Sequence, residues 1–152
     1  MDFHILAFVY TIGCCLTSMV IAGISGSSED KDWFANLNHP DNAFLLKIMN
    51  TIGIIFFLSF GFMLYHLFVR GEVITIVLAI LIILFMGLSP ALKYKTKNLK
   101  LFFVAMLVFP ILTVGLLFLL LPSFLLAIPV IAFSLWLVYD LSYYYRLMKL
   151  NE

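Results

Sequence analysis

Charged residues divide the chain into five long apolar runs. The runs cover residues 3–25, 44–69, 73–94, 101–121 and 124–145. Each run is long enough to cross a bilayer, because about 20 helical residues span its hydrocarbon core. Residues 26–43 remain as a long and polar first loop. We therefore predict an all-α, polytopic membrane protein in which residues 1–152 form a single bundle of five transmembrane helices.

The last two runs need a break between them. No charge occurs from Leu101 to Tyr139, a stretch of 39 positions, and as one helix this stretch would be about twice as long as a bilayer is thick. The break is predicted at Leu121-Pro122-Ser123, because proline ends one helix and is well accommodated in the first turn of the next. Pro110 and Pro129 lie inside the last two predicted helices and are expected to kink them.

Composition agrees with this pattern. Hydrophobic residues make up 64% of the 152 positions and charged residues 11%, whereas soluble domains are about half apolar and a quarter charged. The first run could be a signal peptide, but it lacks a basic n-region and ends in Ala22-Gly23-Ile24-Ser25 without a clean A-x-A cleavage site. We expect it to be a retained helix.

The distribution of lysine and arginine predicts the orientation. Five spans place the loops and termini on two sides of the membrane. One side has Arg70 as its only basic residue, and the other side has all the remaining ones. These are Lys31, Lys47, Lys93, Lys95, Lys97, Lys100, Arg146 and Lys149. Positive charge marks the cytoplasmic side, so the N-terminus is predicted outside and the C-terminus in the cytoplasm, in a bacterial inner membrane.

Asp140 is the strongest candidate for a functional residue within a span, because ionisable side chains at membrane depth are usually functional. Phe133, Trp136, Tyr143 and Tyr144 share its helix face. The alternative is an interfacial aspartate that is bonded to a tyrosine or paired with a lysine inside an ordinary aromatic belt.

Other chemistry has little support in the sequence. The three histidines show no metal-ligand spacing, and Cys14 and Cys15 are predicted to be small buried residues. No catalytic motif is present, and a net charge of +1 without a basic stripe gives no basis for a nucleic-acid partner. Small residues of the second run, Thr51, Gly53, Ser59 and Gly61, are expected to serve helix packing.

One segment carries a family resemblance. Residues 33–40 read Trp-Phe-x-x-Leu-x-His-Pro, and without a gap they lead to Phe57, Gly61 and Tyr65. This register resembles the TspO/MBR family of tryptophan-rich sensory, or translocator, proteins, also known as peripheral-type benzodiazepine receptors. The family signature is W-Y-x-x-L-x-K-P followed by Tyr, Gly and Tyr in the second helix. Leu88-Ser89-Pro90 and the closing segment 146–151 are similar to further family motifs.

The resemblance implies a five-helix receptor or transporter-like protein, often a homodimer, that binds hydrophobic ligands such as tetrapyrroles (protoporphyrin or haem) or sterols in a pocket capped by the first loop. It requires no cofactor. The expected ligand-binding residues combine the family register with the aromatic and acidic positions of the last run. They are Trp33, Phe34, Pro40, Phe57, Gly61, Tyr65, Trp136 and Asp140. Porphyrin carboxylates are expected to meet Lys47 or His39.

Two alternatives stay open. The chain could be a non-catalytic subunit whose helices only pack within a larger complex, or a lipid- or tetrapyrrole-modifying enzyme with Asp140 as its acid/base. The aromatic pair Trp33 and Phe34 likewise has two interpretations: interfacial anchoring, or a lid over a pocket between the helices.

Overall fold

The computed structural model describes residues 3–40 and 48–152. Within these ranges it contains helices and no strand. The helices are α1 (Phe3–Ile24), α2 (Ser28–Ala35), α3 (Met49–Arg70), α4 (Val73–Thr96), α5 (Leu99–Met106), α6 (Val108–Leu120) and α7 (Phe124–Leu150). Five stretches are long and apolar enough to cross a membrane, with α5 and α6 together forming one of them. The predicted all-α architecture of five spans is confirmed.

Most boundaries fall near the predicted ones. The break before the last helix lies at Leu121-Pro122-Ser123, since α6 ends at Leu120 and α7 begins at Phe124. Helices α4 and α7 extend beyond their predicted ends, to Thr96 and Leu150. Residues 44–47, the predicted start of the second span, lie outside the described residues.

A second break separates α5 from α6 at Leu107. Its amide donates to the Val104 carbonyl at 3.2 Å, the tighter bond of a helix end. Pro110 explains the break, because proline has no N–H to donate to the carbonyl four residues earlier, that of Met106. The kink expected at Pro110 is thus a short interruption just before it, whereas Pro129 lies within the single helix α7.

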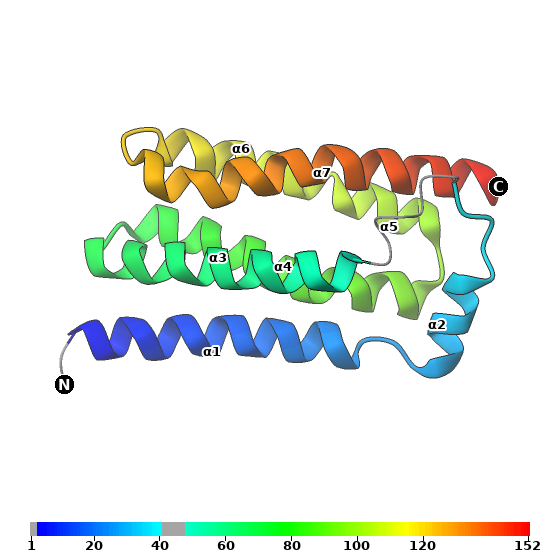
Figure 1. Ribbon diagram of the computed structural model, residues 1–152, viewed down its shortest axis with the longest axis horizontal. Coiled ribbons are helices and arrows are strands. Elements are labelled where there is room, and N and C mark those ends of the chain that lie inside the picture. Colours follow the sequence, from blue (N-terminus) through cyan, green and yellow to red (C-terminus); the bar gives the residue numbers. More distant parts are fainter. Residues whose placement is uncertain (1–2, 41–47) are drawn as a thin grey trace.

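The helices form three layers (Figure 1). Helix α1 lies along one side and packs on α3 and α4, which form the middle layer, and α5, α6 and α7 form the third. Helix α2 lies across one end of the bundle, near the α4–α5 turn and the C-terminus. We call this the α2 end. The start of α1 and the α3–α4 and α6–α7 turns lie at the opposite end.

A cluster of phenylalanines joins the middle and third layers. The Phe133 ring of α7 meets Phe56 and Phe60 of α3 at centroid distances of 5.1 and 5.4 Å, and Phe109 of α6 at 5.5 Å. All three contacts are edge-to-face, the arrangement that the ring quadrupole favours. Phe60 and Phe109 are almost fully buried. One aromatic side chain of α7 therefore holds three helices together.

Helix α1 is attached by close backbone approach. A methyl group added to Gly87 of α4 would lie 2.6 Å from the backbone oxygen of Ser18, and one added to Gly61 of α3 would lie 3.1 Å from Cys15 Sγ. Small residues allow such approach where lipid removes the hydrophobic drive for helices to associate. Of the predicted small positions, Gly61 serves packing. Gly53 does not, because a methyl group there would have no atom within 4 Å.

Gly87→Ala is expected to destabilise the protein by about 1–3 kcal/mol, since the added methyl group must displace backbone rather than a flexible side chain. Gly13→Ala is the matched control: its site on α1 is open, and replacing a helical glycine there stabilises by about 0.5–1 kcal/mol. The measurement is unfolding by sodium dodecyl sulfate in mixed micelles, followed by circular dichroism. Equal transition midpoints for the two variants would contradict the close α1–α4 contact.

Candidate functional site

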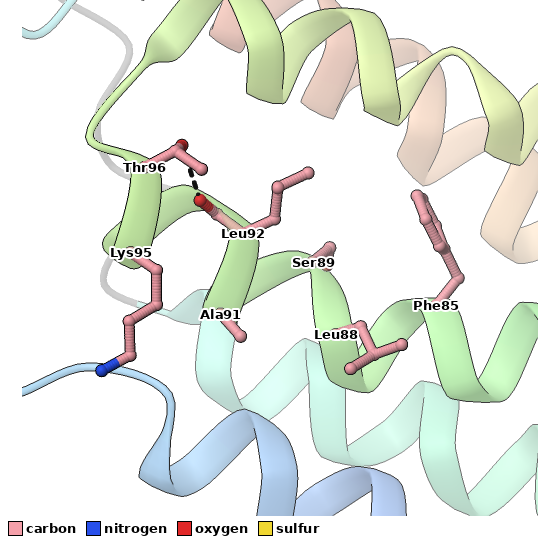
Figure 2. Close-up of a pocket in the computed structure, with 7 residues that line it drawn as sticks. All are labelled: Phe85, Leu88, Ser89, Ala91, Leu92, Lys95 and Thr96. Atoms are coloured by element: carbon pink, nitrogen blue, oxygen red, sulfur yellow. Dashed lines mark hydrogen bonds between the residues drawn. The ribbon is translucent and has the colours of Figure 1, made fainter.

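One face of α4 bears a concave surface, which we do not regard as a ligand site. It encloses about 390 Å³ and is lined by Phe85, Leu88, Ser89, Ala91, Leu92, Lys95 and Thr96. All of these belong to one helix (Figure 2). Its two hydroxyls are already engaged, because Ser89 Oγ donates to the Met86 carbonyl and Thr96 Oγ1 to the Leu92 carbonyl, at 3.3 and 2.7 Å. Among the described residues of this lining, Lys95 is then the only polar side chain without such a bond to its own helix.

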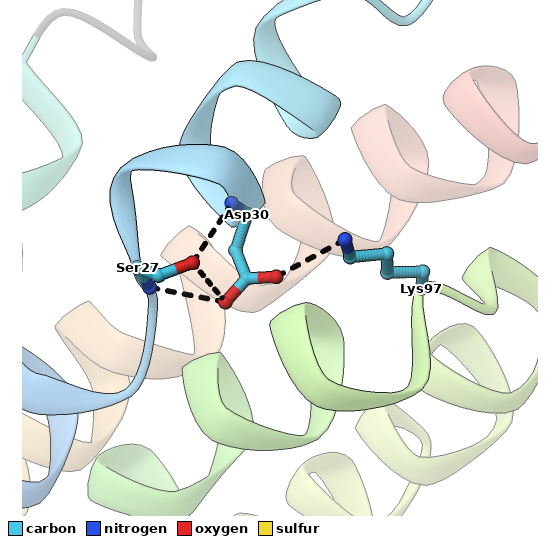
Figure 3. A network of polar contacts seen from close by, with 3 residues as sticks. All are labelled: Ser27, Asp30 and Lys97. Atoms are coloured by element: carbon cyan, nitrogen blue, oxygen red, sulfur yellow. Dashed lines mark hydrogen bonds and ion pairs between the residues drawn. The ribbon is translucent and has the colours of Figure 1, made fainter.

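A second candidate site lies at the α2 end. Helix α2 was not predicted from the sequence, and it begins in a capping box. Ser27 Oγ accepts from the Asp30 amide at 3.2 Å, and the Asp30 carboxylate accepts from the Ser27 amide at 3.0 Å. Asp30 also pairs with Lys97 of the α4–α5 turn at 3.2 Å (Figure 3). The Ser27 amide chiefly, then the Ser27 hydroxyl and Lys97, lower the pKa of Asp30. The pattern Ser-x-x-Asp could have revealed this helix start.

Residues 28–40, which we call the cap segment, are fastened to the bundle at two further points. The Asn38 amide donates to Asn151 Oδ1 and its carbonyl accepts from Asn151 Nδ2, both at 3.0 Å. His39 Nδ1 lies 2.6 Å from the Tyr143 hydroxyl, and His39 Nε2 lies 2.9 Å from the Phe34 carbonyl. Because a carbonyl can only accept, Nε2 carries the proton and Nδ1 accepts from Tyr143.

Beneath the cap segment lies a cluster of buried polar side chains between α4 and α7. Its members are Lys93, Asp140, Tyr143 and Tyr144, and we call it the buried polar cluster. Lys93 is 7% exposed and Asp140 5%. Lys93 Nζ donates to the Tyr144 hydroxyl at 3.3 Å. Two ionisable side chains of opposite type are thus largely removed from water.

Aromatic rings surround the Lys93 ammonium. Its nitrogen lies 4.1 Å from the Phe34 ring centroid, 4.5 Å from that of Tyr94 and 5.7 Å from that of Tyr144. These distances are within the range of cation–π attraction. Because Phe34 belongs to α2 and Lys93 to α4, this contact attaches the cap segment to the charge that it covers.

A second concave surface adjoins the cap segment. This groove encloses about 320 Å³ and is lined by Pro40, Leu135, Val138, Tyr139, Ser142, Tyr143 and Arg146. Helix α7 supplies most of this lining, and Pro40 of the cap segment supplies the rest. The groove therefore combines apolar and aromatic surface with a hydroxyl and an exposed guanidinium, the mixture expected of a site for an amphipathic ligand. Asp140 lines neither of the two concave surfaces.

The structure separates the predicted ligand-binding residues into two groups. Phe34, Pro40 and Asp140 come together at the α2 end. Phe57, Gly61 and Tyr65 instead follow the α1–α3 interface. There the Phe57 carbonyl accepts from Cys15 Sγ, Gly61 adjoins the same sulfur, and the Tyr65 hydroxyl lies 3.1 Å from His4 Nδ1.

The two predicted tryptophans make ring contacts, and within the described part of the chain only that of Trp33 involves a member of either group. Trp33 is half-buried, and the ring contact found for it among the described residues is with Phe34, at 6.3 Å. Trp136 packs on Phe56 of α3 and on Tyr139, at 6.4 and 5.3 Å. Lys47, expected to meet a porphyrin carboxylate, lies outside the described residues.

Sequence reasoning missed the role of Lys93. Its place in the lysine-rich turn predicts a role in membrane orientation, yet it lies inside α4 and is buried. A signal was available, because a buried aspartate such as Asp140 needs a basic partner. Among the described residues no group of three or more potential ligands could hold a metal ion.

Comparison with known proteins adds no identification. The chain matches no protein-family model, and no similar curated protein or solved structure was found. The resemblance to the TspO/MBR family therefore stays a prediction.

Phe34→Ala is expected to loosen α2, because it removes the ring that Lys93 contacts. The free energy that opposes opening of α2 should fall by about 1–2 kcal/mol, the range of a partly desolvated cation–π contact. Hydrogen exchange of the Ser28–Ala35 amides in lipid nanodiscs measures this opening. Trp33→Ala is the matched control on the neighbouring position, and an equal loss of protection in both variants would refute the proposed role of Phe34.

Asp30→Asn is expected to weaken the start of α2 and to remove the part of its pH dependence that arises below about pH 4. Since the folded-state pKa of Asp30 lies below its ordinary value, its stabilisation is present above about pH 4 and is lost as the pH falls through the folded-state value. Protection factors of the α2 amides should therefore fall in acid for the wild type and be low throughout for the variant. Glu29→Gln, an exposed acid in the same turn, should behave as wild type; the same loss in that variant would argue against the capping box.

Proposed function

We propose that this protein is an integral membrane receptor or transporter-like protein that binds a hydrophobic small molecule in the groove beside the cap segment. The groove itself is the supporting observation, because its lining combines the exposed Arg146 with the apolar surface of Leu135, Val138 and Tyr139. Its volume of about 320 Å³ is near the lower limit for small-molecule sites.

The composition of the groove favours an amphipathic ligand that carries an acidic group. The ligand's rings or chain would lie against the apolar lining, and its carboxylate would accept hydrogen bonds from the Arg146 guanidinium and the Ser142 hydroxyl. A tetrapyrrole dicarboxylate such as protoporphyrin has this chemistry and is also the ligand that the resemblance to the TspO/MBR family implies. The groove would hold one edge of so large a molecule.

The orientation and assembly of the protein belong to the same proposal. We place the α2 end in the cytoplasm of a bacterial inner membrane, because the exposed residues Lys31, Lys95, Lys97 and Lys100 lie there. The homodimer is carried by the family resemblance alone.

Arg146→Gln is expected to raise the dissociation constant for protoporphyrin about tenfold or more, since a hydrogen bond to a charged group contributes about 1.5–3 kcal/mol. Binding is measured by titrating the purified protein in detergent micelles and following the Soret absorption band together with quenching of tryptophan fluorescence. Lys149→Gln is the control, because Lys149 is exposed on the same helix but does not line the groove.

The titration separates the alternatives. Val138→Trp should fill the groove and abolish binding while the far-ultraviolet circular dichroism stays unchanged. Absence of any saturable change in the wild-type protein would overturn the proposal and favour a packing subunit of a larger complex. Equal affinities in the Arg146→Gln and Lys149→Gln variants would place the ligand elsewhere.

A further inference from the structure

Lys93 and Asp140 are buried opposite charges that interact without touching. Each is affected electrostatically by the other, yet the described residues contain no direct ion pair between them. Both side chains are largely buried, with Lys93 7% and Asp140 5% exposed. A carboxylate that is buried without a direct ion pair is costly, and ionisable groups within membrane spans are commonly sites where protons bind.

Within the described residues, few other groups near the pair could titrate. Those that face it are aromatic hydroxyls and one histidine: Tyr94 of α4, Tyr139, Tyr143 and Tyr144 of α7, and His39 of the cap segment. The titratable residues of α3 that are described (Tyr65, His66 and Arg70) lie toward the opposite end, Lys100 of α5 is exposed, and α6 has none.

We propose that Lys93 and Asp140 form a proton-binding site whose occupancy controls whether the cap segment stays on the bundle. The Asp140 carboxylate takes a proton from a hydronium ion of the aqueous phase at the α2 end, so one O–H bond forms as another breaks. No electron is transferred. The net charge of the pair changes from zero to +1. This proposal does not depend on ligand binding in the groove.

Contact between Lys93 and Phe34 transmits the change. While Asp140 is ionised, its charge compensates the ammonium, which holds the Phe34 ring at 4.1 Å. Once Asp140 is neutral, the ammonium is buried without a counter-charge, and exposure to water relieves that cost. Phe34 covers the ammonium at the α2 end, so its exposure requires α2 to move away. Acidification therefore opens the cap segment.

The test follows Trp33, which neighbours Phe34 on α2. The chain has two tryptophans, so Trp136→Phe leaves Trp33 as the sole reporter. This variant is reconstituted in phosphatidylcholine vesicles and taken from about pH 8 to about pH 5. Trp33 is expected to become more accessible to acrylamide on acidification, and Asp140→Asn should give the accessible state at every pH. The ratio of open to closed α2 should rise about tenfold or more.

Three further variants in the same background identify the sensor. Lys93→Met, and Lys93→Met combined with Asp140→Asn, should keep Trp33 protected at every pH, because no buried ammonium remains and methionine still packs on Phe34. His39→Gln should retain the pH response, since its amide can donate to the Phe34 carbonyl and accept from Tyr143 without titrating.

Each contrary result overturns the proposal. A response that disappears in His39→Gln would make the histidine the sensor. A response that survives in Asp140→Asn, or a wild-type protein whose Trp33 accessibility does not change, would show that the pair does not govern the cap segment. Circular dichroism of each variant checks that the helices are intact.

Discussion

The ammonium of Lys93 has to be compensated in a place from which water is excluded, and much of the α2 end is arranged around that requirement. Helix α7 packs on α3, α5 and α6, so side chains of the buried polar cluster supply its link to α4. The Tyr144 hydroxyl accepts from Lys93, and Phe34, Tyr94 and Tyr144 present their rings to it. An isolated lysine here would be too costly to bury, and the cap segment is the cover that completes its environment.

Helix α1 is attached by close packing of small residues, in contrast to the buried polar contacts that link α4 to α7. Insertion of this helix into a bilayer is driven by its apolar surface, but lipid provides no hydrophobic drive for α1 to pack on its neighbours. The contact must therefore come from close approach of the helix backbones, which Gly87 of α4 allows beside Ser18 of α1. Even there the Ser18 and Thr11 hydroxyls are buried without a partner among the described residues. The bundle is thus held by small residues on one side and by aromatic rings around Phe133 on the other.

The sequence predicted the spans well and the site only in part, for a physical reason. Apolar length decides whether a helix crosses a membrane, and that length can be read locally; even the break at Pro122 follows from proline chemistry. Which faces meet is a tertiary property, and a uniformly apolar helix gives no periodicity from which to infer it. Gly53 and Gly61 therefore looked alike, Gly87 was missed, and Phe57, Gly61 and Tyr65 turned out to face α1.

The pairing of Lys93 with Asp140 could not be predicted from the sequence for the same reason. The sequence marked Asp140 as a buried acid with a lysine or a tyrosine as its expected neighbour, and both kinds of residue lie near it. Choosing Lys93 from the cluster of Lys93, Lys95 and Lys97 required knowing which helix face of α4 turns inward. That information is absent from a run that is apolar on every side.

Tyr143 links the two proposals. Its side chain lines the groove, its hydroxyl bonds His39 of the cap segment, and it lies within electrostatic reach of Asp140. Pro40 belongs to the lining of the groove, so a cap segment that leaves the bundle takes part of the ligand site with it. A ligand that needs this part of the lining favours the closed state, in which Asp140 is ionised. Linkage is reciprocal: ligand in the groove must then disfavour proton uptake by Asp140 by the same factor by which that proton weakens the ligand.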